Sequence, residues 1–342
     1  MYSNQNEDIN QQILRLFSQK LNQESNGDQN TPFADTLLRT IERLSSDYQY
    51  SNAVAHAKLP KCLEGLDTVD IFSPRSACFQ GVEGAWSHIA TKKMYPNSEL
   101  INVPTFNDVF IAVSSRQVDV GVVPIDNTTA GAVAEVYESL IKHNLNIINC
   151  YSLPVAQCLA ANTKYIKNIT RVFSHPQALA QCTLLLETLN AEIFPAQNTA
   201  VAAQAVLESG SPSDAVLCSS DAAKLYGLNI LVADASDTKH NQTRFIAVTK
   251  DILLLPNADK ISLYLTLPHE TGSLSTVISA FNDFGISMTK IQSRPLPEKP
   301  WEYCFYIDFH GNITNHETKS ILLKFEAELP IFKFLGNYSE IN

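Results

Sequence analysis

The stretch Asn241-Gln242-Thr243-Arg244-Phe245 combines side chains that can act together on a small anion. The hydroxyl of Thr243 can donate a hydrogen bond to a departing oxygen. The guanidinium of Arg244 can bind a carboxylate through two parallel hydrogen bonds. The same residues are also typical of the start of an ordinary β-strand. The stretch therefore predicts a site only if other parts of the chain supply matching groups.

The segment Gly81–His88 could bring backbone donors to the same anion. It follows a strand candidate and opens a helix, so its glycines would let amides near Gly84, Ala85 and Ser87 approach a ligand. The N-terminus of the following helix favours negative charge. The alternative is a tight strand-to-helix turn without a ligand, which is the commoner use of a glycine pair.

The segment Pro124–Gly131 adds polar side chains where another apolar strand candidate ends. Asn127 and Thr128 offer side-chain donors, and Asp126 offers a carboxylate. An asparagine or threonine before a helix is also the usual N-cap, which is a structural role alone. Both interpretations stay open at this point.

A third polar segment is Ser174-His175-Pro176-Gln177, which Gln181 follows one helical turn later. Ser174 has no general base beside it in the sequence, so a nucleophilic serine is not favoured. For His175 a turn or surface position is the simpler interpretation.

Residues 76–250 alternate apolar strand candidates with amphipathic helices, which is typical of an α/β fold with a largely parallel sheet. The predicted strands are Ala77–Phe79, Val118–Val123, Leu145–Cys150, Val155–Ala160, Ala215–Cys218, Ile230–Ala233 and Phe245–Val248.

A break at Pro256–Asp259 separates this region from a second pattern. The predicted order there is strand 260–267, helix 273–284, strand 286–293, strand 301–309, helix 315–327 and strand 330–335. This βαββαβ order is the ferredoxin-like arrangement. Gly272-Ser273-Leu274 opens its first helix and Gln292-Ser293-Arg294-Pro295 ends its second strand. Both segments would serve core packing whatever else they do.

The N-terminal part predicts two short amphipathic helices. Residues 9–21 carry apolar side chains at helical spacing, a polar tract follows at 22–30, and Thr31-Pro32 is typical of an N-cap with proline in the first turn. Two such helices cannot form a core of their own, so we expect them to pack on the main body or on a partner.

The composition narrows the class of protein. The chain of 342 residues is 45% hydrophobic and 18% charged, as in ordinary globular proteins, and suits two or three domains. Its net charge of −10 argues against a nucleic-acid partner. No apolar run could span a membrane, and no signal peptide is visible at the start. The seven cysteines are scattered, which fits free thiols in a reducing cytoplasm.

In their order along the chain, the motifs between Gly81 and Phe245 resemble those of the prephenate dehydratase domain. The two later motifs resemble the phenylalanine-binding motifs of the ACT domain that usually follows it. The resemblance covers about residues 76–340 and implies two α/β lobes, similar to periplasmic binding proteins, with the active site between them. The implied domains are a helical segment at 1–60, the dehydratase domain at 61–254 and the ACT regulatory domain at 258–342.

The resemblance also implies a reaction. Prephenate loses CO2 and water and gives phenylpyruvate in phenylalanine biosynthesis, driven by aromatisation of the ring, with no metal or organic cofactor. The implied catalytic residues are Thr243, Arg244, Asn127 and Asp126. The implied substrate-binding residues are Gly84, Ala85, Ser87, Thr128, Ser174, Gln181 and Phe245. Because the chain is acidic, we expect local donors to hold this dicarboxylate.

Regulation and assembly are implied in the same way. L-phenylalanine would be an effector bound between ACT domains, so the chain is expected to form a homodimer or homotetramer. The implied effector-binding residues are Gly272, Ser273, Leu274, Gln292, Ser293, Arg294 and Pro295.

The sequence departs from the family pattern at four places. Asp126 replaces a glutamate, Gln157 stands where the family usually has histidine, Ser220 lies where some relatives have glutamate, and Gln292 replaces a glutamate. These departures leave open a catalytically weak relative that senses an amino acid or binds a small acid.

The N-terminal helices resemble a shortened chorismate mutase domain. Ile13–Leu21 is similar to its first helix and Leu44–Gln49 to its last. The middle of that domain and its basic residues are missing, and a dianionic transition state needs such cations. A bifunctional enzyme is therefore disfavoured, and we interpret the segment as a relic that could act as a dimerisation arm.

Overall fold

The computed structural model describes residues 32–66, 68–69, 72–296 and 299–341. The predicted helix at 9–21 lies outside this set. The described residues fall into two units. The α/β unit lies within Asp70–Leu253 and Tyr338–Asn342, and the C-terminal unit lies within Met1–Val69 and Leu254–Asn337.

The first lobe of the α/β unit is a mixed sheet of strand order β2-β1-β3-β11-β5, with the short β4 paired to β3. β1 runs parallel to β2 and β3, whereas β11 runs antiparallel to both β3 and β5. The elements are β1 (Ser76–Gln80), α3 (Trp86–Met94), β2 (Glu99–Val103), α4 (Phe106–Ser114), β3 (Val120–Asn127), β4 (Gly131–Ala132), α5 (Ala134–His143), β5 (Asn146–Pro154) and β11 (Gln242–Thr249).

The prediction of a largely parallel sheet is wrong, here and in the second lobe, because both sheets are mixed. A parallel neighbour requires a crossover connection, but β11 returns from the second lobe and enters between β3 and β5 in the opposite direction. The predicted strands are present, and four additional strands are found, namely Glu99–Val103, Gly131–Ala132, Arg171–Ser174 and Glu192–Pro195.

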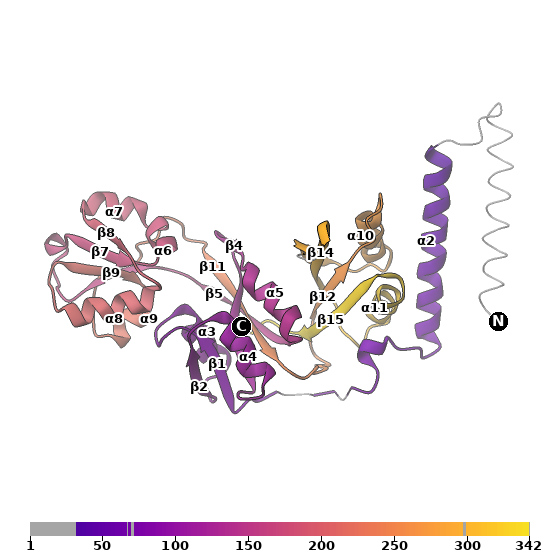
Figure 1. The fold of residues 1–342 in the computed structure, drawn as a ribbon, viewed down its shortest axis with the longest axis horizontal. Helices are drawn as coiled ribbons and strands as arrows, with labels where there is room; N and C mark the ends of the chain where they lie inside the picture. Colours follow the sequence, from indigo (N-terminus) through magenta and orange to yellow (C-terminus); the bar gives the residue numbers. More distant parts are fainter. Residues whose placement is uncertain (1–31, 67, 70–71, 297–298, 342) are drawn as a thin grey trace. The chain divides into compact units, whose positions relative to one another are not determined.

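The second lobe is a five-stranded sheet of order β10-β6-β9-β7-β8. Figure 1 shows α6 and α7 on one face of this sheet and α8 and α9 on the other. The elements are β6 (Cys158–Ala161), β7 (Arg171–Ser174), α6 (Pro176–Ala180), α7 (Thr183–Leu189), β8 (Glu192–Pro195), α8 (Thr199–Ser209), β9 (Asp214–Cys218), α9 (Ser220–Leu225) and β10 (Asn229–Val232).

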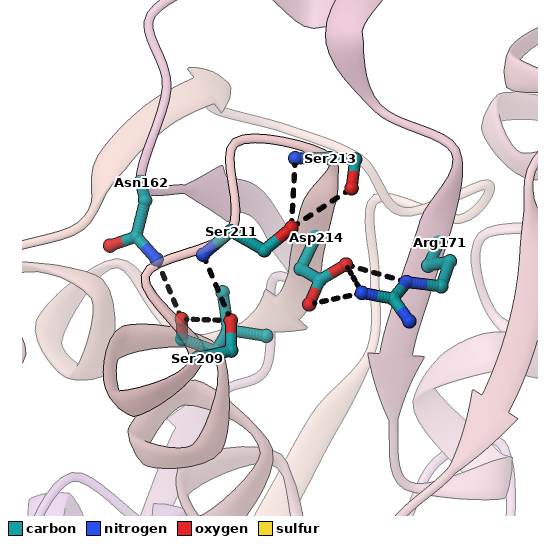
Figure 2. Close-up of polar contacts among 7 residues, drawn as sticks. Asn162, Arg171, Ser209, Ser211, Ser213 and Asp214 are labelled. Atoms are coloured by element: carbon teal, nitrogen blue, oxygen red, sulfur yellow. Dashed lines mark hydrogen bonds and ion pairs between the residues drawn. The ribbon is translucent and has the colours of Figure 1, made fainter.

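Strand β7 is fixed to β9 at both ends. At its start, Arg171 Nε and Nη2 donate to Asp214 Oδ1 and Oδ2 at 2.7 and 3.0 Å, as Figure 2 shows beside a group of linked serines. At its end, Ser174 Oγ donates to Leu217 O at 2.6 Å. A bidentate pair fixes the relative orientation of its two side chains. Together with the Ser174 bond, it gives the segment that follows β7 a defined starting position.

The helices of the first lobe lie close to the sheet. An added Cβ at Gly121 on β3 would come within 2.4 Å of Val109 and 2.9 Å of Val113 on α4. On the opposite face, α3 packs Ile89, Ala90 and Met94 into the core. The sheet that carries the polar strand ends is thus covered on both faces.

The C-terminal unit has the βαββαβ order and a four-stranded sheet of order β13-β14-β12-β15. Its boundaries lie within a few residues of those predicted. The elements are β12 (Lys260–Thr266), α10 (Ser273–Asp283), β13 (Met288–Leu296), β14 (Lys299–His310), α11 (His316–Glu328) and β15 (Ile331–Tyr338). Among the helices of the described residues, none is long and apolar enough to cross a membrane.

Helix α2 (Pro32–Ala55) packs against α11 and α10 of the same chain (Figure 1). Its Asp47 lies 2.8 Å from Lys324 Nζ, whose residue is 2% exposed, and Glu328 lies 3.1 Å from the same nitrogen. Ser46 Oγ donates to Glu328 at 2.6 Å. The helix therefore completes the C-terminal unit through buried charges as well as apolar contacts.

The last residues of the chain pair with β5 of the α/β unit. Cys150 N donates to Ser339 O at 3.2 Å, and Ile341 N donates to Cys150 O at 2.8 Å. Ser152 Oγ donates to Glu340 Oε1. Ile341 also packs against the core of the first lobe. These residues extend a sheet that would otherwise end at β5.

Candidate active site

A cavity of about 160 Å³ lies where strand ends of the first lobe meet helix starts of the second. The strands β1, β3 and β11 contribute from one side, and the segments around α6 and α8 from the other. Its lining consists of Gln80, Ala85, Trp86, Ser87, Asn127, Val155, Gln157, His175, Gln177, Ala178, Gln181, Asn198, Thr199 and Thr243. Five predicted site residues are among them, namely Ala85, Ser87, Asn127, Gln181 and Thr243.

Asn127 and Thr243 stand side by side at this cavity. They are partners in the antiparallel pairing of β3 with β11. Asn127 Nδ2 donates to Thr243 Oγ1 at 2.9 Å and to Asn241 Oδ1 at 2.8 Å. The threonine oxygen thus acts as an acceptor toward Asn127.

The other end of the Asn127 side chain shapes the turn after β3. Its Oδ1 accepts hydrogen bonds from Thr129 N at 3.0 Å, from Thr129 Oγ1 at 2.7 Å and from Ala130 N at 2.8 Å. Thr129 Oγ1 also contacts Asn241 Oδ1 at 3.0 Å. With all its polar atoms engaged, the Asn127 carboxamide has a fixed orientation.

The predicted residues of the Gly81–His88 segment divide between two roles. Ala85, Trp86 and Ser87, at the start of α3, line the cavity. Gly84 does not. It adopts φ +84°, and an added Cβ would lie 3.2 Å from Ala222 Cβ on α9. The predicted substrate contact at Gly84 is therefore replaced by close packing of the two lobes.

Strand alternation separates the four predicted catalytic residues into two pairs. Asp126 and Arg244 are the next partners in the same ladder, and neither lines the cavity. Successive residues of a strand face opposite sides of the sheet. Tyr137 Oη on α5 donates to Asp126 Oδ1 at 3.3 Å. Asp126 and Arg244 thus belong to the face that bears α5, away from the cavity.

Three predicted substrate-binding residues lie elsewhere. Ser174 is fully buried and its hydroxyl is committed to Leu217 O. Phe245 is 1% exposed and packs in the core under α3. Thr128 Oγ1 donates to His240 O at 3.2 Å and accepts from Gln242 N at 2.9 Å, which joins two loops. In this arrangement all three are structural, because packing or local hydrogen bonds occupy their side chains.

His175 lines the cavity and also caps α6. Its Nδ1 accepts a hydrogen bond from Gln177 N at 3.2 Å. Burial lowers the pKa of His175 below its ordinary value. The imidazole is therefore neutral at pH 7 and contributes no positive charge to the cavity.

The cavity is lined by carboxamides and contains no ionisable side chain besides His175 among its lining residues. The carboxamides are Gln80, Asn127, Gln157, Gln177, Gln181 and Asn198. Asn198 caps α8, accepting from Val201 N at 2.7 Å. Gln80, Asn198 and Thr199 were not predicted, although Gln80 ends β1 and the other two open α8. Ligands of α/β sheets bind at strand ends, and helix N-termini favour anions. Their position at the ends of these elements is the feature of the sequence from which these three residues could have been predicted.

Gln157 is the most deeply buried of these carboxamides. The residue is 1% exposed, and its Oε1 has no hydrogen-bond partner among the described residues. Its backbone is held on both sides, since Gln157 N donates to Ser236 Oγ at 2.9 Å and Ala235 N donates to Gln157 O at 2.8 Å. The described residues contain no cluster of side chains that could hold a metal ion.

The predicted effector residues occupy two separate places in the C-terminal unit. Gly272, at φ +91°, caps α10, and Ser273 and Leu274 border a hollow of about 390 Å³. Gln292–Pro295 lie on β13, which is an edge strand, and β14 stands between it and β12. In the part of the chain that the structure describes, the hollow bordered by Ser273 and Leu274 has no residue of Gln292–Pro295 in its lining.

The α/β unit that carries the cavity is similar in sequence to known proteins. The family model described as prephenate dehydratase matches residues 77–252. The arogenate dehydratase/prephenate dehydratase 2 of Arabidopsis thaliana is 34% identical over 296 residues, which cover 82% of this chain and 77% of the plant protein.

Two solved structures show similar folds. A prephenate dehydratase from Arthrobacter aurescens in complex with L-Phe has a TM-score of 0.71 and 28% identity over 77% of this chain and 90% of its own. GqqA, described as a novel type of quorum quenching acylase, has a TM-score of 0.70 and 25% identity over 78% of this chain and 98% of its own. The family match spans more than half of the chain and includes both strands that carry Asn127 and Thr243. The chain therefore belongs to the prephenate dehydratase family.

Proposed function

We propose that this protein converts prephenate to phenylpyruvate with loss of CO2 and water. The observation that supports this most is the Asn127–Thr243 pair at the cavity, because the Thr243 oxygen accepts from Asn127 and its hydroxyl lines the cavity as a donor. Ring aromatisation drives the reaction, so the protein needs to assist one departing oxygen and to hold the rest of the substrate.

In this proposal Thr243 is the catalytic donor. Its oxygen accepts from Asn127, which leaves its own hydrogen for the leaving hydroxyl of the substrate. The substrate carboxylates are held by the first amides of α3, by Ser87 and by Gln181, all of which line the cavity. Arg244 was expected to clamp a carboxylate, but it does not line the cavity, so we assign this task to the neutral donors.

A second candidate substrate is arogenate, the amino-acid counterpart of prephenate, which appears in the name of the Arabidopsis relative. Arogenate carries an ammonium group where prephenate has a ketone, and its loss of CO2 and water yields phenylalanine. The absence of lysine and arginine from the cavity lining favours it, because its net charge is one unit less negative.

We propose that the C-terminal unit is an ACT domain that binds L-phenylalanine between two copies of the chain. The βαββαβ order supports this, as does the similarity to a prephenate dehydratase solved with L-Phe. Because the Gly272 and Gln292 motifs do not meet within one chain, a homodimer or homotetramer would bring them together. Feedback inhibition by phenylalanine is the expected consequence.

The test is a pair of assays on the purified chain. Phenylpyruvate formed from prephenate, or phenylalanine formed from arogenate, establishes the dehydratase. Conversion of neither compound favours the weak sensor of amino acids or small acids. Calorimetry with L-phenylalanine, on a sample shown to be at least dimeric, tests the effector proposal. Chorismate should not be converted above its uncatalysed rate, because the N-terminal segment is too short for a mutase domain and lacks the cations that its dianionic transition state needs.

A further inference from the structure

Gln157 lines the cavity and carries a buried hydrogen-bond acceptor. Its residue is 1% exposed, it lines the cavity, and its Oε1 has no partner among the described residues. Leaving a buried polar atom unsatisfied is costly, and such atoms in native proteins call for an explanation. A ligand that fills the cavity and donates a hydrogen bond would supply the missing partner.

The position of this carboxamide is set by the backbone. Gln157 N donates to Ser236 Oγ at 2.9 Å, and Gln157 O accepts from Ala235 N at 2.8 Å. The adjacent β6 begins at Cys158, a buried residue of the second lobe. Gln157 is therefore held between two anchored segments, and its side chain extends from a fixed point.

The two candidate substrates differ at one group. Prephenate has a ketone, which only accepts hydrogen bonds, while arogenate has an ammonium, which donates up to three. Their ring hydroxyl and both carboxylates are the same. A buried acceptor that lacks a hydrogen-bond partner therefore distinguishes arogenate from prephenate when it lies next to the ammonium or ketone group. The contribution of this acceptor to specificity is greatest when no charged acceptor competes with it. No Asp or Glu is among the lining residues of the cavity.

We propose that Gln157 is a specificity-determining residue that selects the amino form of the substrate, by accepting a hydrogen bond from its ammonium group at Oε1. This inference rests on the proposed dehydratase function and concerns the same cavity. Gln157 takes no part in bond breaking. It adds binding energy that arogenate can use and prephenate cannot, so its effect falls on the ratio of kcat/KM for the two compounds.

The experiment compares that ratio in the wild-type chain, in Gln157→Leu and in Gln157→Met. A ratio measured on one preparation does not depend on the fraction of folded protein. Both variants keep the apolar bulk and remove the acceptor. We expect each to lower the arogenate-to-prephenate ratio by about 10- to 100-fold, the scale of one hydrogen bond to a charged group. Melting curves record any general loss of folding.

Gln177→Leu is the matched control. Gln177 also lines the cavity, but it is exposed and water can satisfy its carboxamide. Its replacement should leave the ratio within about twofold of the wild type, since exposed hydrogen bonds contribute little net binding.

Several results would overturn the inference. An equal fall of kcat/KM for both compounds would mean that Gln157 contacts a group they share, such as the ring hydroxyl. An unchanged ratio, or a wild-type chain that converts prephenate alone, would also refute it while leaving the dehydratase intact. A wild-type chain that converts neither compound would remove the proposed function itself, and the inference with it.

Discussion

Asn127 Nδ2 donates a hydrogen bond to Thr243 Oγ1 across 2.9 Å, which determines the direction in which the threonine hydroxyl can act. A hydroxyl that accepts from one neighbour keeps its single hydrogen for another. Among the described residues, no acceptor forms a hydrogen bond with the hydroxyl hydrogen of Thr243. The pair therefore amounts to a hydrogen-bond donor at the cavity, positioned by a carboxamide that five further hydrogen bonds hold in place.

Replacement of Thr243 by alanine should lower kcat by about 100-fold or more, the usual scale for a positioned proton donor. KM should change much less, because the bond strengthens in the transition state. Thr243→Ser keeps the hydroxyl and should retain more activity. Thr249→Ala on the same strand, outside the cavity, serves as control, and its kcat should stay near the wild-type value. Normal turnover by Thr243→Ala would show that this hydroxyl is structural.

Replacement of Asn127 by aspartate tests the direction of the bond rather than its presence. A carboxylate has no hydrogen to donate, so Thr243 would donate to it and lose its free hydrogen. We expect kcat to fall by about 100-fold although the side chain is isosteric. Asn97→Asp adds the same charge at an exposed position between α3 and β2, outside the cavity lining, and controls for electrostatics. If both variants lose activity equally, charge and not bond direction is responsible.

Removal of Asp47 should destabilise the C-terminal unit. Lys324 is 2% exposed and lies 2.8 Å from Asp47, so Asp47→Ala leaves a buried cation with less compensation. A loss of about 3 kcal/mol in the free energy of unfolding is expected from breaking a buried pair. Urea unfolding measures it. Asp251→Ala breaks the exposed pair with Arg116 and should shift the midpoint very little. Similar shifts for both variants would contradict the buried role of Lys324.

The stability of the α/β unit should fall in mild acid. Gly84 N donates to His88 Nδ1 at 3.0 Å, and burial lowers the pKa of His88 below its ordinary value. An unfolded histidine gains a proton near pH 6.5, whereas folded His88 resists until a lower pH. The unfolded state then binds more protons, so stability decreases as pH falls below about 6.5 and through the folded pKa.

Urea midpoints measured between about pH 7.5 and 5.5 check this, with His88→Asn as the comparison. The variant should show a smaller loss across the range. Some loss should remain, because burial also lowers the pKa of His143 and His175. Equal slopes for the two proteins would assign the effect to other groups.

The sequence predicted the elements of the fold more completely than the placement of its side chains. Apolar runs such as Ala215–Cys218 and Phe245–Val248 are strands because they are buried on both faces, and such runs are visible in a sequence. The exposed strand β8 lacks this pattern, with all four residues exposed, and was missed. The antiparallel entry of β11 depends on a connection through another lobe, which no local pattern encodes.

In the candidate site, too, the sequence predicted which residues matter better than it predicted where their side chains lie. Asn127 and Thr243 were predicted from motifs, but their pairing arises from the register of β3 and β11. Ser174 was expected to face the ligand, yet it turns inward and bonds Leu217 O, a choice set by tertiary contacts. Gln157 stood out in the sequence only as a departure from the family pattern, and its burial gave that departure a physical meaning.

The pairing of Ser339–Ile341 with Cys150 makes residues 254–337 an insertion within the α/β unit. The chain leaves the α/β unit after Leu253 and re-enters it at Tyr338, so the inserted unit is tethered at both ends. A chain that ends at Leu253 would lack residues 338–342 and the two backbone hydrogen bonds that they form with Cys150. Strand β5 would then be an exposed edge, open to pairing with another molecule. Loss of activity in such a truncation would then report a damaged sheet rather than lost regulation. A chain in which residues 254–337 are deleted and 338–342 are joined directly to Leu253 distinguishes a damaged sheet from lost regulation.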